Sequence, residues 1–297
     1  MVEGSNPSRP ISVCFLAPSS SQVRTPGFHP GNTGSNPVGV TSLRPADKKA
    51  GRSFIEGHMS IQGILFDKDG TLVDYTQTWV PTNRLVAQRI AGPNKDHVDT
   101  LLTAVGHDPT TDHVTPNSTI AAGTNRDVAA AWHPIVMKWG HSYTIENLAA
   151  AIDAGFKEGV LKHLTPVCDL VELLTQLRQM GMKIGIATAD SHAGALAFVN
   201  RLDLGLFFDF ICGYDSGHGN KPTPGMVNAF CSAVSLPPHD IAMIGDSVHD
   251  LEMGRNAGVG LSVGVLTGAC RESDLAPFAD CVLSDVSLLP TLIEQLG

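Results

Sequence analysis

The 297-residue chain is short of charged residues (16%) and aromatic residues (6%), and its six cysteines include no C-x-x-C pair. So low a charged fraction excludes a disordered, solvating chain. No apolar run reaches the roughly 18 residues of a membrane helix, so we expect no membrane contact. The cysteine spacing excludes the usual zinc and disulfide frameworks and is typical of a reducing compartment, which predicts a cytoplasmic protein.

Enough apolar residues are present (42%) for a sizeable core, and the length indicates two domains or one domain with a large insertion. The net charge of −9 argues against a protein that coats nucleic acid. This charge is uneven along the chain. Residues 1–58 hold six of the 20 basic and three of the 29 acidic residues, so the remainder holds 14 basic and 26 acidic residues and carries −12.

The composition changes at the same place. Pro, Gly and Ser occupy 23 of the first 58 positions. Such a segment cannot bury enough apolar surface to offset its ordering entropy, so we expect residues 1–58 to be disordered.

A second interpretation treats residues 1–58 as mis-annotated, translated upstream DNA, with the true start at Met59. The tetrapeptide Gly-Ser-Asn-Pro occurs twice, at 4–7 and 34–37. The common T-arm sequence of transfer-RNA genes, GGTTCGAATCC, encodes this tetrapeptide in one frame. Both interpretations place the fold after residue 58.

The rest of the chain alternates short apolar runs with helical patterns, which indicates a buried parallel sheet covered by helices. The expected strands are Ile61–Phe66, Lys183–Thr188, Phe210–Cys212, Ile241–Ile244 and Leu261–Leu266. The expected helices between and after them are Val167–Met180, Ala193–Leu202, Gly225–Val234, Asp250–Asn256 and Val286–Gln295.

The helix Val167–Met180 has the clearest end signals. Thr165 is a plausible N-cap, Pro166 suits the first helical position, and Gly181 suits the position after the C-cap.

One long stretch, residues 75–163, shows helical patterns and no convincing strand. We therefore predict an α/β fold, a doubly wound Rossmann-like parallel sheet (residues 59–74 and 164–297) with an inserted all-helical cap (residues 75–163). Ligands bind beyond the carboxyl ends of the strands in such sheets.

The first polar cluster at a strand end is FDKDGTL, residues 66–72. Asp67 can attack phosphorus and form an aspartyl phosphate, and Asp69 can exchange protons with the leaving group and water. Gly70 permits the sharp turn. A simple Asx turn at the strand exit is the alternative explanation of this motif alone.

Three further clusters follow later strands. Thr188 and Ala189 offer a hydroxyl and backbone N–H groups to a phosphate, and Lys221 supplies a fixed positive charge. Asp246 and Asp250 add two carboxylates at a strand-to-helix turn, the ligand type that Mg²⁺ prefers.

In their order and spacing, the four clusters resemble the haloacid dehalogenase-like superfamily of phosphohydrolases, from Ile61 to Leu296. The chain is most similar to the phosphoglycolate-phosphatase-like branch, which has a helical cap after the first motif. The resemblance implies an aspartyl-phosphate mechanism with Asp67 as nucleophile, Asp69 as general acid/base and Lys221 as a catalytic cation.

The same resemblance implies that Thr188, Ala189 and Lys221 bind the phosphoryl group. It implies Mg²⁺ as cofactor, held by Asp67, Asp246 and the backbone carbonyl of Asp69. Asp250 is expected to support that metal site.

Two positions depart from the family pattern. Ala189 stands where relatives often carry Asn, and Gly225 stands where they often carry an acidic residue. Neither change removes a catalytic group. Asp69 favours phosphate-ester cleavage, because the dehalogenases of the superfamily lack an acid there and its phosphonate-cleaving members usually carry Ala.

The expected function is therefore Mg²⁺-dependent hydrolysis of a small phosphorylated metabolite, with a phosphoglycolate-like substrate favoured and sugar phosphates and nucleotides open. The alternatives are a phosphomutase of the same superfamily or a phosphoaccepting signalling switch. No nucleic-acid partner is expected, and the oligomeric state is not readable from the sequence.

Several cap residues are candidates for the substrate face, although aromatic residues at helical spacing more often belong to a core. His107 and His113 are expected to be solvated. The substrate-face candidates are Trp79, Arg84, Arg126, Trp132 and His133.

Overall fold

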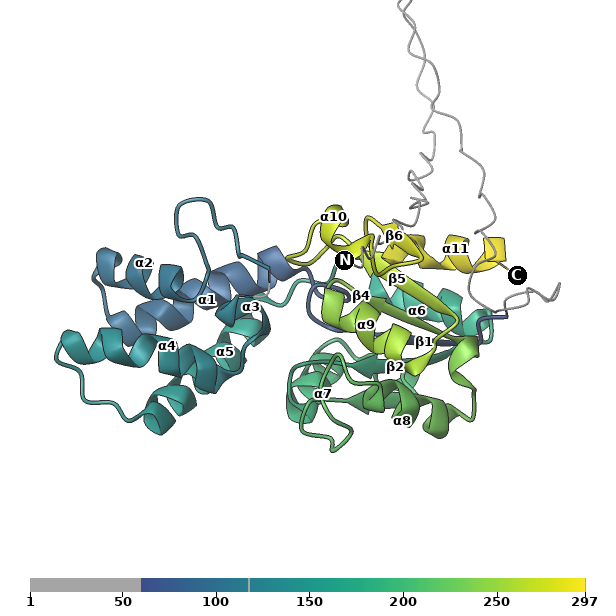
Figure 1. The fold of residues 1–297 in the computed structure, drawn as a ribbon, viewed down its shortest axis with the longest axis horizontal. Coiled ribbons are helices and arrows are strands. Elements are labelled where there is room, and N and C mark those ends of the chain that lie inside the picture. The colour runs from purple at the N-terminus through teal and green to yellow at the C-terminus, as the bar shows by residue number, and fades with distance from the viewer. Residues whose placement is uncertain (1–59, 117, 297) are drawn as a thin grey trace, which may run out of the picture.

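The structure, a computed structural model, describes residues 60–116 and 118–296 (Figure 1). The expectations for residues 1–58 lie outside this range. In the described part, six parallel strands form one sheet in the order β3-β2-β1-β4-β5-β6. The strands are β1 (Gly63–Phe66), β2 (Lys183–Ala187), β3 (Phe210–Cys212), β4 (Ile241–Gly245), β5 (Leu261–Val265) and β6 (Cys281–Leu283).

The first strand occupies the middle of the sheet, between β2 and β4. Phe66 pairs in register with Ile186 of β2 and with Ile244 of β4. The three strands therefore end level with one another, and the residues that follow them meet at one edge of the sheet. From β1, the strands β2 and β3 follow on one side of the sheet, and β4, β5 and β6 follow on the other. Doubly wound sheets bind ligands at the point where the strand order switches sides in this way.

Helices cover both faces of the sheet. Successive side chains of a strand point to opposite faces, and on both faces they are buried. Ile64 and Phe66 pack toward α6, α7 and α11, whereas Leu65 packs toward α8 and α9. The core helices are α6 (Leu170–Gln179), α7 (His192–Arg201), α8 (Gly225–Val234), α9 (Val248–Ala257), α10 (Glu272–Leu275) and α11 (Leu289–Leu296).

This arrangement confirms the predicted fold class, and five of the six strands were expected. The sixth, β6, was not predicted.

The start of α6 differs from the prediction. The helix begins at Leu170, and its N-cap is Asp169, whose side chain accepts a hydrogen bond from the N–H of Glu172. Pro166 instead forms an antiparallel bridge with Val73. The expected C-terminal signal is present, since Gly181 has a φ of 82° directly after the C-cap.

Residues 75–163 contain helices and no strand in their described part. The helices are α1 (Tyr75–Ala91), α2 (Lys95–Ala104), α3 (Thr119–Ala122), α4 (Asn125–Lys138) and α5 (Ile145–His163). They enclose a hydrophobic cluster of their own, with Leu101, Trp132 and Ile152 fully buried. Figure 1 shows this helical unit beside the sheet, beyond the carboxyl ends of the strands.

The chain enters and leaves the helical unit through neighbouring segments. Val73 forms a bridge with Pro166, and the N–H of Asp74 donates to the carbonyl of Thr165 at 2.9 Å. The N–H of Thr165 in turn donates to the hydroxyl of Thr78 at 3.0 Å. The two crossing segments are therefore tied to each other at one junction.

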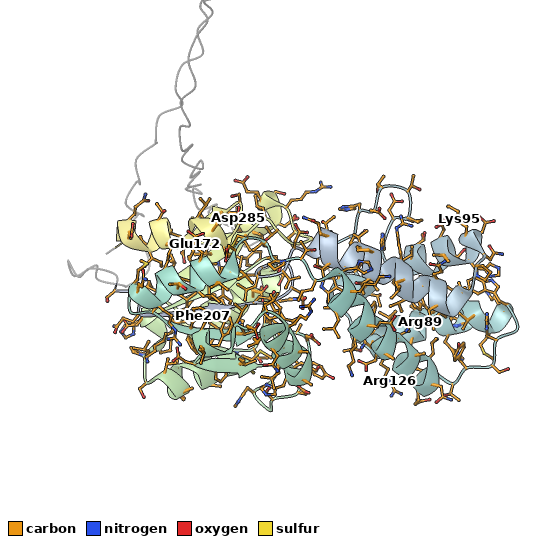
Figure 2. All side chains as sticks on the ribbon, turned by 180° about the vertical axis from the view of Figure 1, so that it is seen from behind. Arg89, Lys95, Arg126, Glu172, Phe207 and Asp285 are labelled. Atoms are coloured by element: carbon orange, nitrogen blue, oxygen red, sulfur yellow. The ribbon has the colours of Figure 1, made fainter. Side chains whose placement is uncertain are left out.

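Charged side chains on the outside of the helical unit form exposed pairs. Lys95 lies at the end farthest from the sheet and pairs with Asp99 (Figure 2). Arg89 of α1 pairs with Glu158 of α5 at 2.7 Å. Exposed pairs of this kind contribute little to stability, so the buried cluster holds the unit together.

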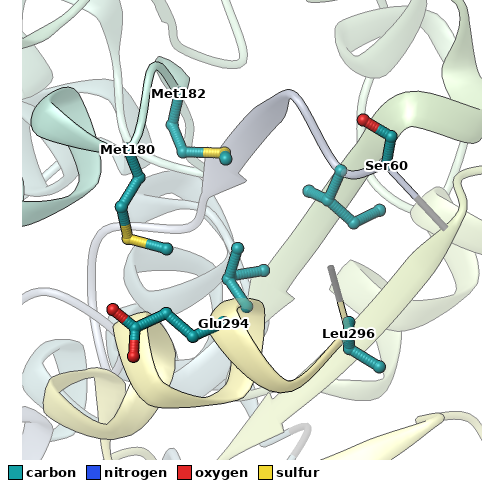
Figure 3. Close-up of a pocket in the computed structure, with 7 residues that line it drawn as sticks. Ser60, Met180, Met182, Glu294 and Leu296 are labelled. Carbon is teal, nitrogen blue, oxygen red and sulfur yellow. The ribbon is translucent and has the colours of Figure 1, made fainter. Parts of the chain in front are cut away.

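A hollow of about 330 Å³ opens near the amino ends of β1 and β2 (Figure 3). Its lining includes Ile61, Met182 and Ile293. It lies at the edge of the sheet opposite the polar clusters, so its volume does not mark the catalytic site.

Among the described helices, none combines the length and the apolar character required to cross a membrane.

Asp209, just before β3, ties α6 to β2 and provides a test of the fold. Its carboxylate accepts hydrogen bonds from Arg178 at 2.7 Å and from the N–H of Ile184 at 2.9 Å. Partial burial alone would raise the pKa of Asp209, but these bonds outweigh it and hold the pKa below its ordinary value. Asp209→Ala should lower the free energy of unfolding by about 1–3 kcal/mol at pH 7 in urea titrations.

The pH dependence of this loss has a defined sign. A depressed carboxyl pKa stabilises the fold above the unfolded pKa, and the benefit disappears as pH falls through the folded pKa. The gap between wild type and variant should therefore narrow toward pH 3. Glu158→Ala, which breaks only an exposed pair, is the control with an expected change below about 1 kcal/mol. An equal loss in both variants would contradict the assignment.

Candidate active site

The structure brings the polar clusters to one edge of the sheet. Asp67 follows β1, Thr188 follows β2 and Asp246 follows β4. Lys221 lies in the loop between β3 and α8, and Asp250 lies in the first turn of α9. Asp67, Thr188, Asp246 and Asp250 are all buried.

Lys221 lies between two of these carboxylates. Its Nζ is 2.5 Å from an oxygen of Asp67 and 2.5 Å from an oxygen of Asp250. The side chain of Lys221 is only 7% exposed. Burial alone would lower the pKa of Lys221, but the two carboxylates more than reverse that effect and keep the ammonium charged.

The carboxylates repel one another. The pKa of Asp67 is raised to about 7, chiefly by burial; Lys221 opposes the rise, while Asp250 and Asp69 contribute to it. Burial likewise raises the pKa of Asp246 well above its ordinary value, and Asp67 and Asp250 raise it further. One lysine is thus insufficient to neutralise the cluster, and a further positive charge would stabilise it.

The donor set fits a divalent metal ion. Oxygen atoms of Asp67, Asp246 and Asp250 lie within 4.8 Å of one another. Buried carboxylate oxygens are the ligands that Mg²⁺ prefers, so these three residues could hold such an ion.

The position of Asp250 is set by a capping box at the start of α9. Its Oδ2 accepts hydrogen bonds from the hydroxyl of Ser247 at 2.6 Å and from the Ser247 N–H at 3.1 Å. Its other oxygen accepts from Lys221. Ser247 was not among the predicted site residues, although the spacing Ser-x-x-Asp is a readable capping signal.

Two glycines leave room for Asp246. A Cβ on Gly70 would lie 2.5 Å from the Asp246 carboxylate, and a Cβ on Gly268 would lie 1.7 Å from its Oδ2. Gly70 also has a φ of 85°, which favours glycine. The hydroxyl of Thr267 donates to the carbonyl of Gly70 at 2.6 Å and joins the two loops.

Asp69 turns away from the carboxylate cluster toward two donors. Its Oδ2 lies 2.6 Å from Nζ of Lys68, and its Oδ1 accepts a hydrogen bond from Nε1 of Trp79 at 3.0 Å. The side chain of Lys68 is almost fully buried and also pairs with Asp190 at 3.2 Å. Lys68 carried no sequence signal beyond its place in the motif.

Thr188 and Ala189 occupy the end of β2. The Thr188 side-chain oxygen accepts a hydrogen bond from the N–H of Asp190 at 3.0 Å, which leaves its own O–H able to donate to a ligand. Ala189 is exposed, and Ser191 caps the following helix by accepting from the N–H of Gly194.

The residues of the helical unit, the predicted cap, that were candidates for the substrate face have different environments. Trp132 is buried in the helical cluster and donates to the carbonyl of Leu101, so it is a core residue. His107 is fully buried and lies 3.1 Å from Asp112, so the expectation that it is solvated was wrong; its loop folds back and buries it. Arg84 also pairs with Asp112.

The remaining polar candidates are held within the cap itself. Arg126 pairs with Glu146, and His133 lies 2.9 Å from the carbonyl of Tyr143. Trp79 is the candidate whose side chain bonds to a predicted catalytic residue.

An all-parallel α/β sheet with clustered carboxylates and a lysine beyond its central strands places the chain in the class of doubly wound α/β proteins, which bind ligands at this edge of the sheet. Residues 64–263 match the family model described as haloacid dehalogenase-like hydrolase. The chain belongs to this family of hydrolases, which confirms the predicted resemblance and the expectation of an enzyme.

Curated relatives include phosphatases. A phosphoglycolate phosphatase from Rhodobacter capsulatus is 34% identical over 127 residues, which cover 42% of this chain and 56% of the relative. A probable phosphatase, IndB, from Dickeya dadantii is 32% identical over 41% of this chain and 55% of the relative. Pyrophosphatase PpaX from Bacillus velezensis is 26% identical over 67% of this chain and 80% of the relative. Two of these matches thus span only about half of the relative's length.

Solved structures share the fold. A protein from Haemophilus somnus described as a predicted phosphoglycolate phosphatase aligns with a TM-score of 0.62 at 17% identity, over 80% of this chain and 99% of that chain. A hydrolase from Pseudomonas syringae aligns with a TM-score of 0.55 at 22% identity, over 78% and 98%.

The pairing of Lys221 predicts a pH-dependent loss of stability when its charge is removed. Lys221→Met leaves Asp67 and Asp250 buried without their cation, which should lower the free energy of unfolding by about 3–5 kcal/mol at pH 8 in metal-free buffer. A carboxyl group whose folded pKa is raised favours folding at low pH, so the deficit should shrink as pH falls from 8 to 5.

The control is Lys157→Met, which removes one partner of an exposed pair with Asp153. Its effect should stay below about 1 kcal/mol. A Lys221→Met deficit that is the same at pH 5 and pH 8 would show that lost packing, and not lost charge, is responsible.

Proposed function

We propose that the chain is a metal-dependent phosphomonoester hydrolase that works through an aspartyl phosphate. The observation that carries this proposal is the contact of Lys221 with Asp67 inside a buried group of carboxylates. A carboxylate held at a strand end beside a fixed ammonium suits attack on an anionic phosphorus centre.

Each residue has a role in this scheme. Asp67 forms the bond to phosphorus while the ester O–P bond breaks, and Asp69 gives a proton to the departing alkoxide. Water then attacks the phosphorus of the phosphoaspartate and gives a proton to Asp69, while the bond between phosphorus and the Asp67 oxygen breaks and releases phosphate and the free Asp67 carboxylate. The hydroxyl of Thr188 and the ammonium of Lys221 bind the phosphoryl oxygens.

Asp67, Asp246 and the carbonyl of Asp69 would hold Mg²⁺, with Asp250 in support. The bound ion would offset the repulsion between Asp67 and an anionic substrate. Because burial places the pKa of Asp67 near 7, added positive charge also keeps the nucleophile ionised at neutral pH.

The substrate that we favour is a small alkyl phosphate of the phosphoglycolate type. The support is a curated relative named phosphoglycolate phosphatase and a fold shared with a protein of the same description. The relatives named pyrophosphatase PpaX make inorganic pyrophosphate the second compound to test.

The central test is phosphate release from a panel of phosphomonoesters and pyrophosphate with and without Mg²⁺. Wild-type enzyme should release phosphate only with Mg²⁺, and Asp67→Asn should reduce turnover at least about a thousandfold, because the nucleophile is lost. Wild-type turnover in Asp67→Asn would refute the aspartyl-phosphate mechanism. An isomerised ester without free phosphate would indicate a phosphomutase instead.

The metal site makes a separate prediction. Gly268→Ala places a methyl group against Asp246 and should weaken Mg²⁺ binding at least about tenfold, because the carboxylate must move. Calorimetric titration of metal-free protein with Mg²⁺ measures this directly. Gly205→Ala is the control, since the nearest atom to its added Cβ is at an ordinary 3.9 Å. Equal affinity in both variants would remove Asp246 from the metal site.

A further inference from the structure

We propose that Trp79 is a positioning residue, which holds the carboxylate of Asp69 from the cap while Lys68 holds it from the core. The inference rests on the proposed function, in which Asp69 protonates the leaving group. Trp79 lies outside the four sequence clusters that carry the family resemblance.

Asp69 has one fixed donor for each of its oxygens. Nε1 of Trp79 is 3.0 Å from Oδ1, and Nζ of Lys68 is 2.6 Å from Oδ2. Two donors on opposite oxygens define the plane of the carboxylate and restrain its rotation. Each oxygen keeps a second lone pair, which can carry the proton that passes to the leaving-group oxygen.

Both donors are themselves held in place. The indole of Trp79 stacks on Tyr75 with a centroid distance of 6.4 Å and contacts the edge of Phe156 at 5.7 Å. The ammonium of Lys68 pairs with Asp190, and its charge lies 6.0 Å from the ring of Phe198. A carboxylate fixed by such supported donors is preorganised for one direction of proton transfer.

The hydrogen bond also crosses between the two parts of the chain. Trp79 lies on α1, four residues into the helical unit, whereas Asp69 follows β1 in the sheet. Figure 1 shows α1 starting where the helical unit meets the sheet. The orientation of Asp69 is therefore set jointly by the cap and by the core.

The test compares two esters of similar size that differ in their need for a proton. Benzyl phosphate releases an alkoxide that requires protonation, whereas 4-nitrophenyl phosphate releases a stabilised anion that does not. The ratio of their kcat/KM values reports on general acid catalysis in the step that forms the phosphoaspartate. A general acid contributes about 10²–10⁴-fold in total, so losing one of the two donors should cost about tenfold.

Trp79→Phe keeps an aromatic ring and removes the N–H. We expect kcat/KM for benzyl phosphate to fall about tenfold and that for 4-nitrophenyl phosphate to change less than about twofold. Trp79→His should restore part of the ratio of the two kcat/KM values. The imidazole Nε2 is separated from Cβ by the same number of bonds as the indole Nε1, so its N–H can donate a hydrogen bond from a similar position. Trp79→Met, which lacks both ring and N–H, gives a second measurement of the same ratio if Trp79→Phe folds poorly.

Trp132→Phe is the matched control, since Trp132 also donates one hydrogen bond, to the carbonyl of Leu101, but inside the cap core. It should lower the melting temperature and leave the ratio unchanged. A Trp79→Phe enzyme that loses activity equally on both esters, or on neither, overturns the positioning role. A wild-type enzyme that releases phosphate from no compound of the phosphomonoester panel, these two esters included, overturns the proposed function itself, so the two failures are distinguishable.

Discussion

The ammonium of Lys221 between Asp67 and Asp250 is the contact on which the rest of the site depends. Buried carboxylates a few ångströms apart cannot all be charged without a nearby cation. Lys221 supplies one positive charge for three buried carboxylates, and burial together with their mutual repulsion raises the pKa values of Asp67 and Asp246. In the proposed function, a bound metal ion would supply further positive charge and would lessen the repulsion between the acidic site and an anionic substrate.

Most residues at the carboxyl edge of the sheet could be predicted from the sequence. The candidate catalytic residues directly follow strands, and the strands are recognisable as short apolar runs. The runs before Asp67, Thr188 and Asp246 are buried parallel strands, and a parallel sheet must align their ends. Which partner each side chain selects was not readable. Lys68 carried no signal of its own, yet it is buried and pairs with Asp69 and Asp190.

The errors have local physical causes. Pro166 and Thr165 carry helix-start signals but belong to the junction with Val73, since tertiary pairing overrides local preference. His107 was expected in solvent, but contacts within its loop bury it. The role of Trp79 depends on the placement of one domain against another, which no local periodicity encodes. The positions of side chains at strand ends were thus predictable, whereas the individual partners that tertiary packing selects were not.

The paired crossing at Val73 and Pro166 has a consequence for how the molecule changes over evolutionary time. The chain leaves the sheet for the helical unit and returns from it at adjacent backbone positions. The helical unit is therefore connected to the sheet in the same way as a single loop. A different insert with closely spaced ends can be grafted there without altering the strands that carry Asp67 and Asp246. Recognition of new compounds can then diversify in one module while the chemistry of the other is inherited unchanged.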